Sequence, residues 1–301
     1  MNKEKFLNLG YNPDDNTKEE IEKLHKEGES LSKVQLKFAD MKNTKLVNAD
    51  LSYADLTRAD FSGASLYGAN LEGATLFKTN LEGANLKSTN MKNCNLLGAD
   101  FSNAKLNNVD WGEGNIVLNE VEAEAAINNG DIETAIEKYK ESEDIYRALK
   151  MSLQSQSLGE DAGKLFLREM IVKRKQLPKY SPLRFAHKFA HIAFGYGEKI
   201  GNILYSILTV IIISAFVYGI EGVSYGDYTL GFWGDVGQFG GILGVLGNLL
   251  YFSVVVFSTV GFGEILPIGP LGKSMMMIEG IAGGLILSIF MIAVYRQLMD
   301  R

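Results

Sequence analysis

The stretch ADLSYADLTRADFSGASLYGAN, residues 49–70, repeats a pattern of five residues. In most pentads a large apolar residue such as Leu51 follows Asp or Asn, and a small residue such as Ala49 stands two places before it. A period of five matches neither the 3.6-residue period of an α-helix nor the two-residue period of a β-strand. The sequence therefore predicts a repeat architecture in this region.

The pattern extends in both directions from this stretch. Large apolar residues stand at every fifth position from Leu31 to Trp111 without interruption. The motif Ala-(Asp/Asn)-Leu resembles that of the pentapeptide-repeat family, over roughly residues 34–111. This resemblance implies a right-handed quadrilateral β-helix, in which each pentad forms one side and both its large and its small residue point inwards. We expect the β-helix to span residues 31–112, after a polar, helical segment at 1–30.

Composition limits what this β-helix could do. Residues 1–110 contain 14 Lys or Arg and 16 Asp or Glu, a balance that argues against mimicry of DNA and against a nucleic-acid partner. A rigid spacer or docking scaffold is the simpler interpretation. The chain has one cysteine, Cys94, which excludes an internal disulfide and a cysteine-based metal site. Cys94 occupies the small inward position of its pentad, where we expect it to fill the core.

The chain changes character near residue 200. Its mean hydropathy is near zero, but residues 1–199 are polar whereas 200–301 are rich in Ile, Leu, Val, Phe and Gly. The first thirty residues have no apolar core and predict no signal peptide. Between the β-helix and the apolar half, residues 119–178 follow a helical period and predict a connector of two or three antiparallel helices, similar to a tetratricopeptide-like pair. Its alternating Glu and Lys residues predict a solvated face.

An amphipathic helix is predicted at residues 183–199, just before the apolar half. Apolar Phe185 and Phe189 alternate with basic residues, a pattern typical of a helix that lies in the membrane interface. His187 and His191 stand four residues apart, but no acidic or cysteine residue accompanies them, so we do not expect a metal site.

Two segments are long and apolar enough to cross a lipid bilayer, at residues 200–220 and 272–298. Basic residues precede the first span and follow the second, and none lies between 200 and 272. The positive-inside rule then predicts a multi-pass protein of the cell membrane with both termini in the cytoplasm. The loop between the spans carries Glu221, Asp227 and Asp235, and we expect it to face outside and attract cations.

The loop also contains a short apolar helix, predicted at 245–258, followed by Ser258-Thr259-Val260-Gly261-Phe262-Gly263-Glu264. This string resembles the potassium-channel signature TVGYG, with Phe262 in place of Tyr and Glu264 in place of Asp. The resemblance implies a homotetramer with a selectivity filter at 259–263. Its K⁺ ligands would be Thr259, Val260, Gly261 and Phe262, supported by Ser258 and Glu264.

The chemistry of such a filter explains its composition. A K⁺ ion that sheds its water needs successive rings of carbonyl oxygens, one from each subunit. Consecutive carbonyls face one axis only if the backbone alternates in hand, which Gly261 and Gly263 permit without a Cβ penalty. Thr259 adds its hydroxyl at the inner end, while Val260 and Phe262 turn outwards.

Three features bear on gating. Gly283 and Gly284 follow the filter at the spacing of a hinge in the inner helix of potassium channels, although glycines also allow membrane helices to pack closely. Glu279 is costly in a bilayer and should face protein or water. No span carries regularly spaced Arg or Lys, and little chain follows the second span. We therefore expect regulation through the N-terminal half, by an unknown cytoplasmic ligand or protein.

Together these patterns predict a multidomain protein: a pentapeptide-repeat β-helix, a helical connector and an all-α two-transmembrane pore-loop domain at 200–301. The predicted function is a potassium-selective channel subunit. A non-selective cation channel and a membrane-tethered scaffold remain alternatives. No constellation of carboxylate, histidine or nucleophile predicts an enzyme, and no nucleotide or calcium motif predicts an organic cofactor or other bound metal.

Overall fold

A computed structural model describes residues 3–299, so the outermost residues of the two predicted terminal segments lie outside it. The described chain divides into two compact units, residues 3–185 and 186–299. The boundary lies inside the predicted amphipathic helix.

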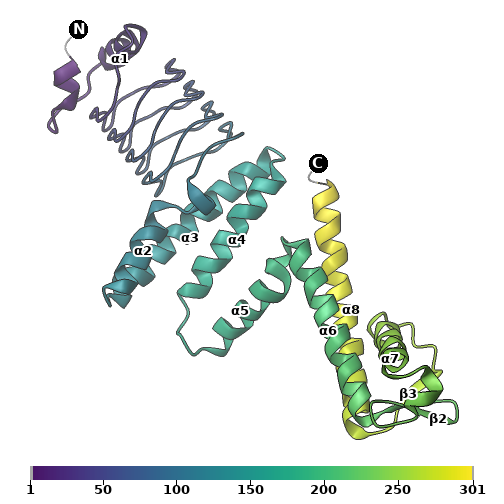
Figure 1. The fold of residues 1–301 in the computed structure, drawn as a ribbon. Coiled ribbons are helices and arrows are strands. Elements are labelled where there is room, and N and C mark those ends of the chain that lie inside the picture. Colours follow the sequence, from purple (N-terminus) through teal and green to yellow (C-terminus); the bar gives the residue numbers. More distant parts are fainter. Residues whose placement is uncertain (1–2, 300–301) are drawn as a thin grey trace. The chain divides into compact units, whose positions relative to one another are not determined.

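The pentads of the first unit form a coil with twenty residues in each turn (Figure 1). Parallel bridges join residues twenty positions apart, from Gln35 with Asp55 to Asn90 with Asp110. Each bridge is a single residue, since every pentad turns a corner at a left-handed position such as Tyr53 or Gly63. The four-pentad coil is thus observed, and its hand stays a prediction.

The side chains of each pentad fall into two groups, one buried inside the coil and one hydrogen-bonded at its corners. The large residue and the small one, such as Leu51 and Ala54, are both buried inside the coil. The Asp or Asn residue binds the backbone of its own corner, as where Asp60 Oδ1 accepts from Ser62 N at 2.9 Å. It also joins neighbouring coils, as where Asn90 Nδ2 donates to Asn70 Oδ1 at 3.0 Å. The (Asp/Asn)-Leu pair therefore encodes both the corner and the stacking.

Helical caps close the two ends of the coil. At the start, a 3-10 helix, Lys3–Leu7, and helix α1, Thr17–Lys26, place Phe6, Ile21 and Leu24 over the first coil with no exposed surface. At the other end, Ser152 of helix α3, Ile132–Ser155, donates to the carbonyl of Phe101 at 2.7 Å. Coil and helices share one hydrophobic core, so this unit is a single body.

Three helices follow the coil: α2, Leu118–Asn128, then α3, then α4, Gly159–Lys175. The break between α2 and α3 lies at Gly130, which has a φ of 79°, and Asp131 caps α3 by accepting from Thr134 N at 3.0 Å. This arrangement agrees with the two or three helices expected.

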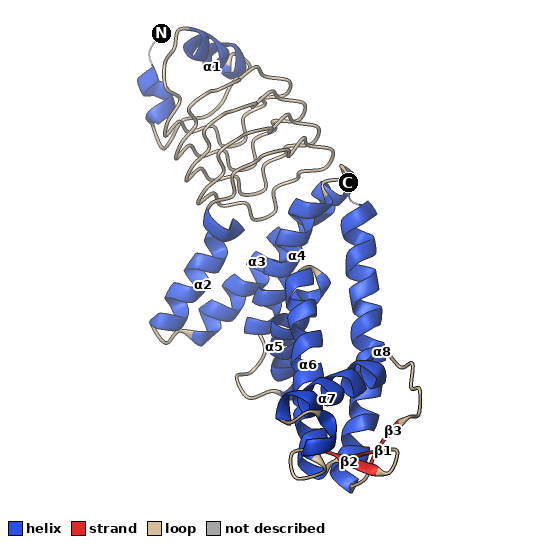
Figure 2. Ribbon diagram, turned by 45° about the vertical axis from the view of Figure 1, so that its right-hand side comes forward, coloured by secondary structure: helices blue, strands red, loops and turns tan. Residues whose placement is uncertain are grey.

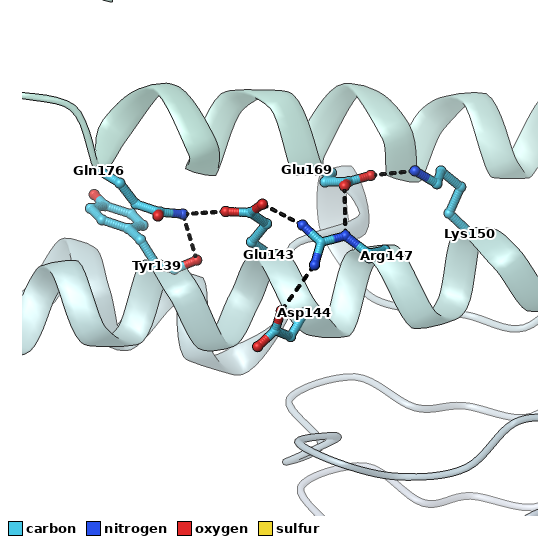
Figure 3. Close-up of polar contacts among 7 residues, drawn as sticks. All are labelled: Tyr139, Glu143, Asp144, Arg147, Lys150, Glu169 and Gln176. Atoms are coloured by element: carbon cyan, nitrogen blue, oxygen red, sulfur yellow. Dashed lines mark hydrogen bonds and ion pairs between the residues drawn. The ribbon is translucent and has the colours of Figure 1, made fainter.

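The alternating Glu and Lys residues were predicted to form a solvated face, but two of the glutamates in these helices are buried. Glu169 on α4 is 6% exposed, accepting from Lys150 Nζ at 2.6 Å and from Arg147 Nε at 3.3 Å (Figure 3). Glu120 on α2 is 1% exposed and pairs with Arg168 at 2.7 Å. The helical period of one helix cannot reveal that a second helix covers its polar face.

The second unit contains two long apolar helices, α6, Ile200–Glu221, and α8, Pro270–Met299 (Figure 2). Both have the length and composition needed to cross a membrane. A shorter apolar helix, α7, Ile242–Phe257, packs against both of them. The predicted spans and short helix therefore exist as helices, with α7 beginning three residues before the predicted residue 245.

The predicted amphipathic helix ends earlier than expected. Helix α5 runs over Pro182–Phe194, and a 3-10 turn, Gly195–Gly197, separates it from α6. All three residues of this turn have a positive φ, between 53° and 87°, which stops the helix. Phe185, Phe189 and Ile192 on α5 are all about 60% exposed, as a helix at a membrane interface would require.

The prediction that the second unit is all-α was also wrong. Strands β1, Val223–Tyr225, β2, Tyr228–Leu230, and β3, Ile265–Pro267, form an antiparallel sheet in the order β2-β1-β3 (Figure 2). Gly226, with a φ of 61°, opens the two-residue turn between β1 and β2. The sheet ties the chain just after α6 to the chain just before α8.

Candidate pore loop and its supports

Helix α7 delivers the chain directly into the predicted filter. Its last turn is closed by Ser258, whose N donates to Val254 O at 2.9 Å and whose Oγ donates to Val255 O at 3.1 Å. Thr259 N still donates to Val256 O at 3.0 Å. The predicted support role of Ser258 is thus compatible with its place as the C-terminal cap of α7.

The backbone beyond Ser258 alternates in hand. Thr259, Gly261 and Gly263 have positive φ angles of 58°, 56° and 76°. Val260 and Phe262, which lie between them, do not have a positive φ. Left-handed backbone costs a residue with a Cβ about 1–2 kcal/mol, so Thr259 is held there against its preference. Alternation over five residues is the geometry that successive carbonyls need in order to face one axis.

A cavity and an open hollow next to this loop are lined in part by residues of the predicted filter and its supports. A small cavity of about 60 Å³ lies between α7 and the loop, with Val255, Phe262 and Met276 in its wall. Glu264 also lines an open hollow of about 920 Å³ together with Asp227, one of the acidic loop residues. Val260 and Phe262 are 56% and 64% exposed in the single chain.

Glu279 lies where α6, α7 and α8 meet, and it has no exposed surface. Tyr218 Oη on α6 donates to its Oε2 at 2.6 Å. Ser253 Oγ on α7 is hydrogen-bonded to its Oε1 and also to the carbonyl of Ile211 on α6, at 2.9 Å. The expectation that Glu279 faces protein holds. The sequence singled out neither Tyr218 nor Ser253, because the three residues lie on different elements and share no spacing.

Glu221, one of the acidic residues between the predicted spans, contacts the start of α8. Its Oε2 accepts from Gly272 N at 2.7 Å, in the first turn of α8. A carboxylate at a helix N-terminus satisfies a free N–H and complements the helix dipole. Glu221 therefore joins the end of the first span to the start of the second.

The two predicted hinge glycines have different surroundings. A Cβ on Gly283 would lie 2.0 Å from the carbonyl oxygen of Phe257, the last residue of α7. A Cβ on Gly284 would meet open space. Helix α8 continues through both residues, so a hinge here stays a prediction, while close packing at Gly283 is observed.

No group of three His, Cys, Asp or Glu side chains that could hold a metal ion occurs within residues 3–299. The two histidines of α5 have aromatic surroundings instead. The ring of His191 stacks on Tyr196 with centroids 5.5 Å apart, and His187 lies 6.1 Å from the same ring.

Comparison with known proteins finds two families on this chain. The family described as pentapeptide repeats matches in eight copies over residues 30–68, 54–93 and 69–108. The family described as ion channel matches residues 205–300. No curated protein matches the chain.

Solved structures of pentapeptide repeat proteins are similar to the first unit. Rfr23 from the cyanobacterium Cyanothece 51142 is 35% identical, covering 26% of this chain and 53% of its own, with a TM-score of 0.26. The protein alr5209 from Nostoc Pcc 7120 is 30% identical, covering 31% of this chain and 76% of its own, with a TM-score of 0.28. HetL from Nostoc sp. strain PCC 7120 is 31% identical, covering 27% and 40%, with a TM-score of 0.15. The chain spans about half the length of Rfr23.

Proposed function

The chain joins pentapeptide repeats to an ion-channel domain, and we propose that four copies of it form a potassium-selective membrane channel. The observation that carries this proposal is the alternating hand of the backbone at Thr259, Gly261 and Gly263, in a loop between two apolar helices. Because a closed ring of carbonyl oxygens needs several copies of one short loop, the proposal includes a homotetramer. K⁺ is then the transported ion, held in turn by the carbonyls of residues 259–262.

The distribution of charge supports an orientation. Both termini would lie in the cytoplasm, because basic residues flank the two spans on that side. The sheet and the hollow lined by Asp227 and Glu264 would then face outside, at the entrance for cations.

The N-terminal unit is proposed to modulate the pore. Its coil and three helices share one core, so a ligand or protein that binds it would act on a rigid body. This coil, right-handed in our proposal, also fits a scaffold that recruits partners. However, a scaffold function alone would not explain the alternating backbone of residues 259–263.

Flux through liposomes tests the proposal. Full-length protein should pass K⁺ well ahead of Na⁺, and Ba²⁺ should block it. Gly261→Ala should abolish selective flux, because alanine is strained at a φ of 56°. Equal K⁺ and Na⁺ flux would favour a non-selective cation channel. Absence of flux, in the full chain and after deletion of residues 1–178, would favour the scaffold.

A further inference from the structure

Glu279 is a buried acid without a cationic partner. It forms no ion pair within the described part of the chain, and none of its surface is exposed. An ionised carboxylate removed from water and left without a cation is costly, all the more in a membrane. The hydrogen bonds around it indicate how this cost is avoided.

Counting the protons in these bonds favours one state of the acid. Ser253 Oγ contacts two oxygens, the carbonyl of Ile211 at 2.9 Å and Oε1 of Glu279. A serine hydroxyl has one proton to donate, and a carbonyl can only accept. If the serine proton goes to Ile211, the contact with Glu279 requires a proton from the carboxyl group. Oε2 meanwhile accepts from Tyr218. A neutral acid lets both contacts of Ser253 be full hydrogen bonds, whereas beside a carboxylate the one serine proton must serve both Oε1 and the Ile211 carbonyl. The buried Ser214 hydroxyl of α6 also lies beside Glu279 and can donate to it or accept from it.

The same acid lies on a two-point contact between α7 and α8. Ser253 and Phe257 are one helical turn apart on α7, and Glu279 and Gly283 are one turn apart on α8. Ser253 is hydrogen-bonded to Glu279, and the Phe257 carbonyl lies against Gly283. Thr259 follows Phe257 by two residues, so this contact fixes the last turn before the proposed filter.

We propose that Glu279 is a neutral carboxylic acid that positions the filter, by holding α7 to α8 through Ser253 and to α6 through Tyr218. The positioning role rests on the proposed function, while the protonation state does not. Glu279 acts as a positioning residue, because α7 stands between it and residues 259–263. Through α7 it connects the inner helix α8 to the filter, so a movement of α8 would shift the filter as well.

Infrared spectroscopy of the full-length protein tests the protonation state. Ordinary Asp and Glu side chains are ionised at neutral pH, so the carbonyl stretch of a neutral acid stands apart from theirs. Wild-type protein should show this band, and it should disappear in Glu279→Gln. If the two spectra agree in that region, Glu279 is ionised and the proposal is overturned.

Flux selectivity tests the positioning role. Glu279→Gln keeps one donor and one acceptor and should retain the K⁺ over Na⁺ flux ratio. Ser253→Ala and Glu279→Leu remove the bond to α7 and should lower that ratio roughly fivefold or more, as expected for loss of a buried hydrogen bond. Ser288→Ala is the matched control, since that hydroxyl on α8 donates to Gly284 of its own helix at 2.8 Å and should have no effect.

The outcomes separate this proposal from the proposed function. If wild-type protein passes K⁺ and Na⁺ equally, the channel proposal fails as to selectivity, and the infrared band still decides the state of Glu279. If Ser253→Ala keeps the wild-type flux ratio, the positioning role is wrong even for a selective channel. Should Glu279→Leu fail to assemble, Ser253→Ala and Glu279→Gln still decide.

Discussion

Gly283 and Gly284 are neighbours in sequence, yet only Gly283 lies against another helix. We predict that Gly283→Ala destabilises the assembled protein by about 1–3 kcal/mol, the usual range for an overpacked contact, because its methyl group would meet the Phe257 carbonyl. Gly284→Ala should leave stability unchanged, because open space surrounds that position. Thermal unfolding of the detergent-solubilised protein measures both. The close contact at Gly283 would be ruled out by equal stability of the two variants.

The alanine variant at Gly284 also tests whether helix α8 bends at the predicted hinge. If α8 bends at Gly284, the alanine variant should stiffen the helix and lower the open probability without lowering the melting temperature. Single-channel recording in a planar bilayer measures this. An unchanged open probability in Gly284→Ala would show that α8 moves, if it moves at all, at another place.

Cys94 predicts a specific dependence of stability on pH. Burial inside the coil raises the pKa of its thiol from an ordinary 9.0 to about 12. The unfolded chain therefore releases this proton near pH 9, whereas the folded chain keeps it. The contribution of the thiol is fully present below pH 9 and is lost as the pH rises towards 12, by up to ~1.4 kcal/mol per pH unit.

Comparison with Cys94→Ala isolates this effect, because alanine occupies the same inward position in many pentads and other groups titrate equally in both proteins. Denaturant unfolding can be followed by the fluorescence of buried Trp111 in a Trp233→Phe background, since Trp233 is 87% exposed. Parallel stability curves for the two proteins between pH 8 and 10.5 would contradict a buried thiol.

At the scale of elements, the ion pairs of the buried Glu169 join α4 to α3 (Figure 3). We predict that Glu169→Gln destabilises the N-terminal unit by about 1–3 kcal/mol, because the largely buried Lys150 loses its ionic partner, whereas the half-exposed Arg147 keeps Glu143 and Asp144. Glu160→Gln, which breaks an exposed pair with Lys164 on the same helix, should cost less than about 0.5 kcal/mol. Denaturant unfolding followed at Trp111 measures both variants. A similar small loss in both would indicate that water screens Glu169 as well.

The elements differ in how far the sequence could predict them. The coil follows from a period that repeats at every fifth residue, so each inward position, including that of Cys94, could be assigned from sequence alone. The sheet could not be assigned with similar ease, because each strand has three residues and β3 lies far along the chain from its partner β1. The Gly-Asp pair between Tyr225 and Tyr228 is a local signal for the hairpin of β1 and β2, but nothing comparable marks β3.

The same contrast between local and long-range signals holds in the second unit. The filter string could be recognised from sequence because its residues are consecutive. Its support could not, because Tyr218, Ser253 and Glu279 come from three helices, and only their packing brings the three side chains together. Burial of Glu169 was missed for the same reason. The period of apolar residues shows which face of a helix is apolar. It does not show which polar residue will be covered by a neighbouring helix.

At the scale of the whole molecule, the proposed modulation of the pore requires a connection between the N-terminal half and the membrane helices. The turn between α5 and α6 offers one. Asn202 Nδ2 donates to Ile192 O at 3.1 Å, and Ser206 Oγ donates to Ala193 O at 2.7 Å. Side chains of α6 thereby satisfy the last carbonyls of α5, which a helix end otherwise leaves to water. A displacement of α5 should then move α6 as well.

This connection predicts a non-additive result. In the wild-type turn, deletion of residues 1–178 should change the open probability several-fold if the N-terminal unit modulates the pore as proposed. With Asn202→Ala and Ser206→Ala together, the same deletion should have little further effect, because the hold of α6 on α5 is already gone. Thr209→Val is the matched control, since Thr209 bonds to Tyr205 O of its own helix at 2.8 Å and should leave the effect of the deletion intact. A deletion effect of equal size in both backgrounds would place the connection elsewhere. In that case the exposed apolar face of α5 would act through the membrane interface rather than through α6.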